Sequence, residues 1–100
     1  MLNIYTTVGR IANIKKETTE SGANKAIITL AVPRTFKNVN GEYETDFIPC
    51  TVLNSIATNT LEYCKQGDLV GIKGRIQSKE NQIEIIAEKL TFLSNKKEEE

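Results

Sequence analysis

The chain has 100 residues, enough for one small domain with a modest hydrophobic core. Its 13 basic and 13 acidic residues cancel, so a nucleic-acid-binding surface would have to come from segregation of charge and not from a basic excess. It contains no histidine, no glycine-rich phosphate loop, no secretory signal and no apolar run approaching roughly 18 residues, which leaves an enzyme or a membrane-spanning protein without support.

The first predicted strand covers residues 2–14 and contains Gly9. Its β-branched side chains favour extended backbone. A glycine inside a strand is typical of a bulge or sharp bend, and a barrel strand that serves two sheets needs such a bend. The polar residues 16–24 that follow are expected to form a surface connection with its turn at Ser21-Gly22.

The second and third predicted strands, residues 25–32 and 45–53, form a hairpin. Pro33 cannot donate to a ladder and is expected to end the second strand or to mark an edge, and Asn40-Gly41 supplies the positive φ angles of a tight turn. Both alternating faces of the third strand carry apolar residues: Ile48, Cys50 and Val52 on one, Phe47, Pro49 and Leu53 on the other. The second apolar face must therefore meet a partner subunit, a ligand or another side of a barrel corner.

A short helix is predicted over residues 56–65, with Asn54 or Ser55 as its cap and Gly67 as its stop. Strands at residues 69–78 and 82–93 follow, joined by a tight turn at Glu80-Asn81. Three strands, one helix and two strands predict an all-β, five-stranded oligonucleotide/oligosaccharide-binding (OB) barrel over residues 1–94, with a charged flexible tail at 95–100. An SH3-like barrel and a small open β-sandwich are the alternatives.

Neither the cysteines nor the carboxylates indicate a metal or catalytic site. Cys50 and Cys64 lack CxxC spacing, so both are expected to be buried, reduced thiols in a cytosolic protein. Glu42, Glu44 and Asp46 share one side of a strand and could hold a cation, but a solvated shoulder of the hairpin is the favoured interpretation. Binding without a metal, a cofactor or catalysis is therefore predicted.

Aromatic and basic residues gather where the second and third strands meet. Phe36 and Phe47 offer rings, and Arg34 and Lys37 offer charge. A single-stranded nucleic acid needs this combination, because its bases stack and its phosphates are anionic. The alternative is that both phenylalanines are ordinary core residues.

An ordered set of short segments resembles bacterial and phage single-stranded DNA-binding proteins of the SSB family. No segment is diagnostic alone, but together they are specific and cover nearly the whole chain. They include residues 8–11, 21–22, 30–38, 45–48, 65–70, 74–76 and 84–93.

The resemblance implies sequence-tolerant, non-catalytic binding and protection of single-stranded DNA in replication, recombination or repair, in the cytoplasm or nucleoid and away from membranes. Bases would stack on Phe36, Phe47 and Leu53, the last at a position where an aromatic is common. The implied phosphate contacts are Arg10, Arg34, Lys37, Lys73, Arg75 and Lys79. Family members usually form homotetramers from dimers that pair their first strands, although a dimer is an alternative. This arrangement would assign the interface to Leu2, Asn3, Ile4, Tyr5, Thr6 and Val8.

The sequence departs from the family pattern in three respects. It has no tryptophan, and its last hairpin, at residues 79–82, is short where relatives carry a long basic and aromatic loop, which implies a smaller site per subunit. It also lacks the glycine-rich linker and acidic tip through which relatives recruit replication and repair proteins. Two other interpretations stay open: an OB-fold interaction or assembly module, such as a primosome-like accessory or degenerate SSB subunit, and an RNA-binding OB domain.

Overall fold

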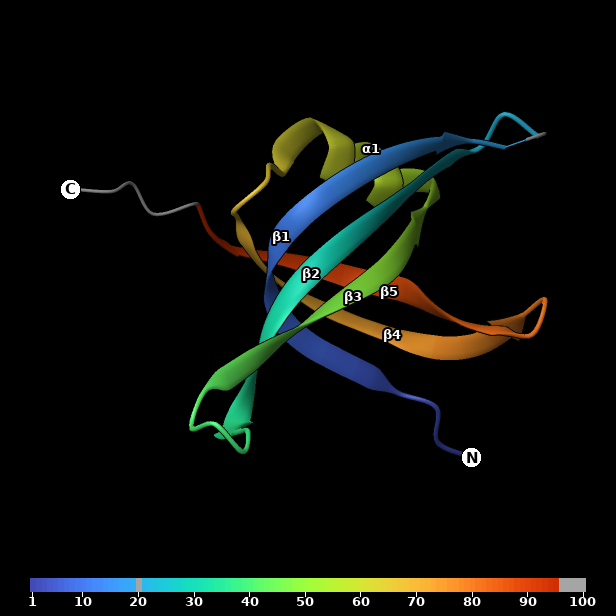
Figure 1. Ribbon diagram of the computed structural model, residues 1–100. Helices are drawn as coiled ribbons and strands as arrows, with labels where there is room; N and C mark the ends of the chain where they lie inside the picture. The colour runs from blue at the N-terminus through green and yellow to red at the C-terminus, as the bar shows by residue number, and fades with distance from the viewer. Residues whose placement is uncertain (20, 96–100) are drawn as a thin grey trace.

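Five strands close into a barrel in the order β1-β2-β3-β5-β4 (Figure 1). This computed structural model describes residues 1–19 and 21–95, so residues 96–100 of the predicted tail lie outside the described residues. The elements are β1 (Tyr5–Thr18), β2 (Asn24–Lys37), β3 (Tyr43–Leu53), α1 (Asn54–Tyr63), β4 (Leu69–Lys79) and β5 (Gln82–Ser94). The predicted OB-type order, with a short helix between the third and fourth strands, is confirmed.

β1 changes partner near Gly9, as the bend predicted there requires. It pairs with β4 from Tyr5 to Arg10 and with β2 from Arg10 onward, so only Arg10 has a partner on both sides. Gly9 is buried at this crossing, and a Cβ atom there would lie 2.9 Å from the carbonyl oxygen of Ala31. The strand begins at Tyr5, later than predicted, and its register shift lies further on, between Ile11 and Asn13.

β2 does not end at Pro33. The strand continues to Lys37, and Pro33 itself is paired with Thr45 on β3. The prediction of a strand end was wrong, but the alternative of an edge is confirmed, because the ladder with β1 stops at Ala31 and leaves β2 paired only with β3 at Pro33. The long hairpin arm then closes at the predicted turn, but only Gly41 has the expected positive φ, of 80°, and Asn40 does not. The N–H of Gly41 donates to the carbonyl of Asn38.

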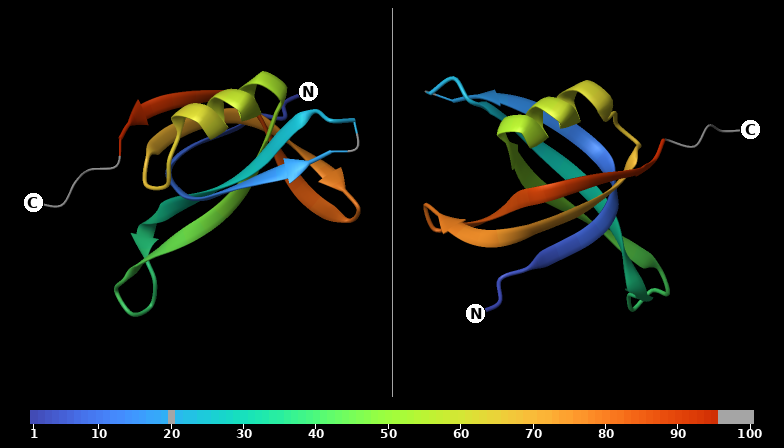
Figure 2. Two further views of the ribbon diagram at one scale, coloured as in Figure 1. Left: turned by 90° about the horizontal axis from the view of Figure 1, so that it is seen from above. Right: turned by 180° about the vertical axis from the view of Figure 1, so that it is seen from behind.

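α1 lies across one end of the barrel (Figure 2) and buries Ala57 and Thr60 there. The predicted side-chain cap was wrong: Leu53 precedes the helix in extended conformation, and no side chain caps the first turn. The helix also ends at Tyr63, before the predicted stop. Gly67, with φ of 97°, instead shapes the turn into β4, where its N–H donates to the carbonyl of Ile11 at 2.7 Å.

The β4–β5 hairpin closes at the predicted turn, where Glu80 and Asn81 have φ angles of 52° and 67°. Further along, the register shifts so that Gly74 pairs with Ala87 whereas Lys73 pairs with Lys89. Glu88 is left between these pairs as a bulge, which re-aims the side chains of β5.

The core fills the barrel with aliphatic side chains and both cysteines. Its largest fully buried members are Ile11, Ile28, Leu30, Val52, Val70, Thr60 and Cys50. Cys50 and Cys64 are buried and unbridged, as predicted, and burial raises the pKa of the Cys50 thiol to about 11. No helix in the described part of the chain is long and apolar enough to cross a membrane.

Candidate nucleic-acid interface

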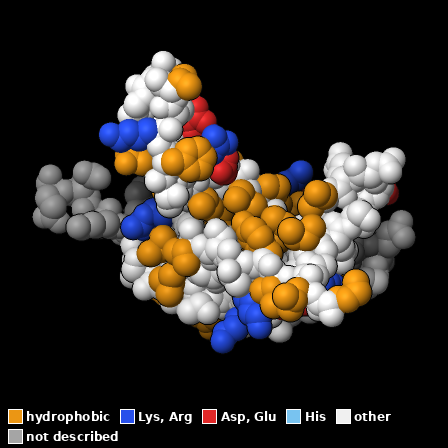
Figure 3. All heavy atoms as spheres, turned by 90° about the horizontal axis from the view of Figure 1, so that it is seen from below, with side chains coloured by type: hydrophobic (Ala, Val, Ile, Leu, Met, Phe, Trp, Pro, Cys, Tyr) orange, Lys and Arg blue, Asp and Glu red, His pale blue; other side chains and the backbone are white. Residues whose placement is uncertain are grey.

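The end of the barrel opposite α1 exposes apolar side chains between two hairpins. Hydrophobic side chains gather across the middle of this face, with Lys and Arg side chains around them (Figure 3). Phe36 and Phe47 are 63% and 64% exposed. The alternative that they are ordinary core residues is therefore excluded.

The two phenylalanines lie on opposite faces of the β2–β3 arm. The Phe36 ring lies 5.9 Å from the guanidinium carbon of Arg34, and Arg34 binds Asp46 on β3. Because Asp46 and Phe47 are neighbours on one strand, their side chains point to opposite faces. Phe36 therefore shares the face of Asp46, and the structure does not bring the two rings together on one surface.

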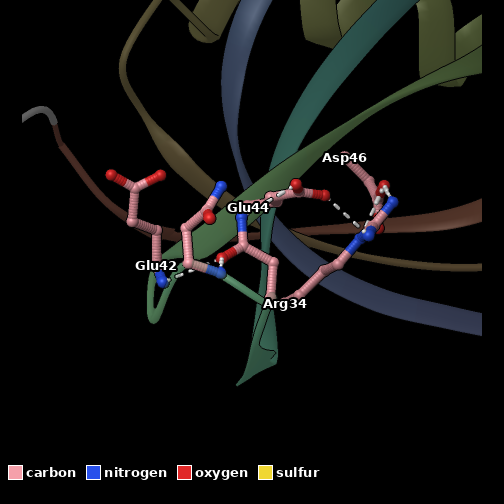
Figure 4. Close-up of polar contacts among 6 residues, drawn as sticks. Arg34, Glu42, Glu44 and Asp46 are labelled. Carbon is pink, nitrogen blue, oxygen red and sulfur yellow. Dashed lines mark hydrogen bonds and ion pairs between the residues drawn. The ribbon is translucent and has the colours of Figure 1, made fainter.

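Arg34 is held by two carboxylates on β3 (Figure 4). Its Nη2 donates to Oδ1 of Asp46 at 2.9 Å, its Nε lies 3.2 Å from both oxygens of Asp46, and its Nη1 donates to Oε1 of Glu44 at 2.9 Å. The hydrogen bond that Arg34 donates lowers the pKa of the Asp46 carboxyl group. The same hydrogen bond, together with the negative charge of Asp46, raises the pKa of Arg34. No group of three potential metal ligands occurs in the described residues, and two of the three predicted shoulder carboxylates serve as partners of Arg34.

Lys37 lies at the far end of the same arm. Its ammonium nitrogen is 5.8 Å from the centre of the Tyr43 ring, and the two residues are paired across β2 and β3. Tyr43 is exposed and is not among the predicted site residues. Tyr43 could have been identified from its position, because it is the first residue of the strand after the Asn-Gly turn and pairs with a lysine on the preceding strand.

A groove of about 290 Å³ separates the outer face of β2 and β3 from the β4–β5 hairpin. Pro49 and Thr51, which share the Phe47 face of β3 by alternation, form one wall, and Ile83 and Lys79 belong to the other. Thr51 donates to Glu84 across the groove at 3.1 Å. Leu53 lies on the same face of β3 but is half-buried.

The remaining predicted basic residues fall into two groups. Arg10 and Arg75 are engaged within the chain: Arg10 donates to the carbonyl of Gly67 at 2.9 Å, and Arg75 pairs with Glu88 at 3.0 Å. Lys73 and Lys79 are exposed on β4, with no carboxylate oxygen of the described residues within 4.0 Å of either ammonium.

The residues predicted for the oligomer interface lie on or just before the start of β1. Leu2, Ile4 and Val8 are exposed apolar side chains. Asn3 is instead engaged within its own chain, because its side-chain amide exchanges two hydrogen bonds with the backbone of Ile76, at 2.7 and 2.9 Å. Among the described residues, Tyr5 to Val8 have ladder partners only on β4. No strand of the described residues pairs with the other backbone edge of this segment.

Known proteins share this chain's sequence over almost its whole length. The model of the Single-strand binding protein family matches residues 2–93. Single-stranded DNA-binding protein B of Bacillus subtilis is 39% identical over 109 aligned positions, which cover 99% of this chain and 96% of that protein. Single-stranded DNA-binding protein 1 of Clostridium acetobutylicum is 40% identical over 83% of this chain and 84% of its own.

A third relative is longer. Single-stranded DNA-binding protein 1 of Staphylococcus aureus strain COL is 42% identical over 96% of this chain, but the match spans only 64% of that protein. Together, these matches show that the chain belongs to the single-strand binding protein family, as its ordered segments predicted.

Proposed function

We propose that this protein binds and protects single-stranded DNA without sequence preference. Membership of a binding family confirms the prediction that it is not an enzyme. The observation that carries the proposal is the exposed Phe47 ring on a β3 face that continues into the groove beside Lys79. A ring for stacking next to a groove bordered by an exposed lysine suits any base sequence, because every base has a π-face.

The proposed stacking residues have unequal roles. Phe47 is the main platform, since it lies on the face that leads into the groove. Phe36 lies on the opposite face of the arm and would meet a strand that passes around the hairpin. Leu53 is half-buried and contributes aliphatic surface where the Phe47 face approaches α1.

The proposed phosphate contacts also differ in availability. Lys37, Lys73 and Lys79 are exposed and can meet a phosphate without losing a carboxylate partner. To contact a phosphate, Arg34 and Arg75 must first give up their ion pairs with carboxylates. Arg10 must give up its hydrogen bond to a backbone carbonyl. We therefore expect the three lysines to contribute most of the salt dependence of binding.

The unpaired edge at Tyr5–Val8 supports assembly of this chain with itself. Two copies can add their edges antiparallel, which satisfies backbone groups and covers Val8. We propose a dimer built in this way, and a homotetramer where two such dimers associate. The proposed setting is the cytoplasm or nucleoid, in DNA replication, recombination or repair.

Titration of poly-dT into the full chain, with solution mass followed in parallel, tests the function. Steep weakening of binding with added salt is expected, because phosphate contacts release counterions. Micromolar or weaker binding at low salt with no salt slope would contradict the proposal. Competition with a matched RNA oligomer separates DNA from RNA preference.

A further inference from the structure

A carboxylate lies in the groove beside the Phe47 face. Glu84 on β5 is half-buried and lines this groove together with Thr51 and Lys79. Thr51 is the residue at which β3 pairs with β5, and its side chain contacts Glu84, so the carboxylate lies where the two walls of the groove meet. A negative charge at this place repels phosphates and does not by itself help to hold a polyanion.

No cation of the described residues neutralises this carboxylate. Their Lys and Arg nitrogens all lie more than 4.0 Å from the Glu84 oxygens, including that of Lys79 in the same groove. Two neutral groups hold the side chain instead. Thr51 Oγ1 donates to Oε2 at 3.1 Å, and Gln77 Nε2 donates to Oε1 at 3.2 Å. Glu84 is therefore held in place without an ion pair.

Both oxygens of Glu84 can accept a further hydrogen bond. A carboxylate has about four acceptor positions, and the two side-chain donors use one on each oxygen. A ligand group that meets these positions must carry N–H or O–H, which a phosphodiester lacks. In a strand bound along the groove, the edge of a base therefore faces Glu84, and the phosphates lie on the side of Lys79.

Guanine is the base whose free edge matches a carboxylate best. Its N1–H and N2–H are adjacent and point the same way, so they can meet both oxygens at once, as a guanidinium does. Thymine offers one N–H between two carbonyl oxygens, and these repel a carboxylate. Cytosine and adenine offer an amino group beside a ring nitrogen that is itself an acceptor. In a single strand these edges are free to be read.

We propose that Glu84 accepts paired hydrogen bonds from the N1–H and N2–H of a guanine in the bound strand. The inference rests on the proposed function, because the guanine belongs to the same single strand. Stacking and phosphate contacts admit every sequence, and the contact with Glu84 adds a graded preference at one position only, with guanine first and thymine last. Glu84 is thus a specificity-determining residue within a general binding groove.

The first test needs no variant. It compares an oligo-dT of about 8 nucleotides, a length within the range for one OB fold, with the same oligomer carrying a single dG at its centre. The wild-type chain should bind the dG oligomer about fivefold or more tightly, the lower end of the discrimination that a paired contact to a base edge gives. Deoxyinosine in place of dG lacks the N2 amino group and should lose most of this gain. Equal affinity for dG and dT, or a full gain with deoxyinosine, would overturn the paired contact.

The second test replaces the carboxylate. Glu84→Gln should abolish the gain from dG, because an amide has one acceptor oxygen where the carboxylate has two, and should bind oligo-dT at least as well as the wild-type chain does. Glu80→Gln is the matched control, since it removes the same charge from an exposed residue that lines the same groove, and it should keep the gain. A gain that survives Glu84→Gln, or that both variants lose equally, would show that Glu84 does not read the base.

The imino proton of the guanine reports on the contact directly. In a free single strand this proton exchanges rapidly with water and gives no sharp signal. A protected imino signal is expected when the dG oligomer binds the wild-type chain and should be absent with Glu84→Gln. A gain in affinity without this signal would assign the preference to stacking and overturn the hydrogen-bonded contact.

Failure of this inference differs from failure of the proposed function. If the function fails, the wild-type chain binds neither the oligo-dT nor the dG oligomer. If only the inference fails, the wild-type chain binds both oligomers with the same affinity, or Glu84→Gln leaves their ratio unchanged.

Discussion

Arg34 and Asp46 form a bidentate pair across the β2–β3 arm, with Nη2 and Nε of the guanidinium at 2.9 and 3.2 Å from the carboxylate. The same guanidinium lies 5.9 Å from the centre of the Phe36 ring. Arg34 therefore links a carboxylate on β3 to an exposed ring on β2. Arg34, which was predicted as a phosphate contact, is therefore placed so that it also steadies the ring proposed for base stacking.

Asp46→Asn should increase the salt dependence of DNA binding. Loss of the carboxylate charge weakens the hold on Arg34, so the guanidinium can meet a phosphate, and the slope of log Kobs against log salt should steepen by up to about 0.7. Salt-dependent titration with oligo-dT measures this change. Glu42→Gln is the matched control, because it removes the same charge from a residue with no ion pair to Arg34. An equal effect of both variants would show that net charge alone is responsible.

Phe47→Ala should weaken binding of oligo-dT by about 1–3 kcal/mol, the usual contribution of one stacked base. The free energy of unfolding should change little, because the ring is 64% exposed. Tyr63→Ala is the control, since this ring is equally exposed but lies on α1, beside a different pocket. Unchanged affinity together with a reduced solution mass would instead assign Phe47 to a subunit interface.

Gly74→Ala should destabilise the fold far more than Gly71→Ala, although both glycines lie on β4. A Cβ atom at Gly74 would clash with the carbonyl oxygen of Ile86, so the bulge in β5 would have to rearrange. A Cβ atom at Gly71 meets nothing closer than 3.8 Å, and alanine there should be neutral or stabilise by about 0.4–1 kcal/mol. Urea denaturation of both variants measures the difference, and equal midpoints would contradict this packing.

The turns and the order of the elements could be predicted from the sequence, because they depend on residues that are close together in the chain. The turns follow from Gly41 and Asn81, which tolerate positive φ, and the element order follows from hydrophobic periodicity. The relation between Phe36 and Phe47 could not be predicted in this way. The missing information is the register: only once Val32 is known to pair with Asp46 does alternation along β2 place Phe36 on the Asp46 face, opposite to Phe47.

Long-range pairing accounts for the other differences. The contacts of Arg34 with Glu44 and Asp46 depend on register between strands, which no local pattern specifies. The missing cap of α1 has a similar origin. Because β3 leads directly into the helix, Asn54 becomes its first residue, with φ of 56°, and is not the residue that precedes it.

Cys50 should make the stability of the protein decline at alkaline pH. Burial raises the pKa of this thiol from 9.0 to about 11, so the folded chain holds the proton more tightly than the unfolded chain does. This contribution to the free energy of unfolding is fully present below pH 9 and is lost as the pH rises from 9 through 11. Denaturation of Cys50→Ala over the same range should show a shallower decline, whatever its stability at neutral pH. A slope identical to that of the wild-type chain would contradict the assignment.

Ile4→Glu with Val8→Glu should reduce the solution mass of the protein to that of a single chain. Both side chains are exposed, at 62% and 53%, and lie at or just before the unpaired edge of β1, where two added charges per copy would oppose each other in a paired dimer. The fold should survive, because neither side chain belongs to the core. Val39→Glu is the control, since Val39 is fully exposed at the tip of the β2–β3 arm. Light scattering of the three proteins without DNA gives the masses, and an unchanged mass for the double variant would place the subunit contact elsewhere.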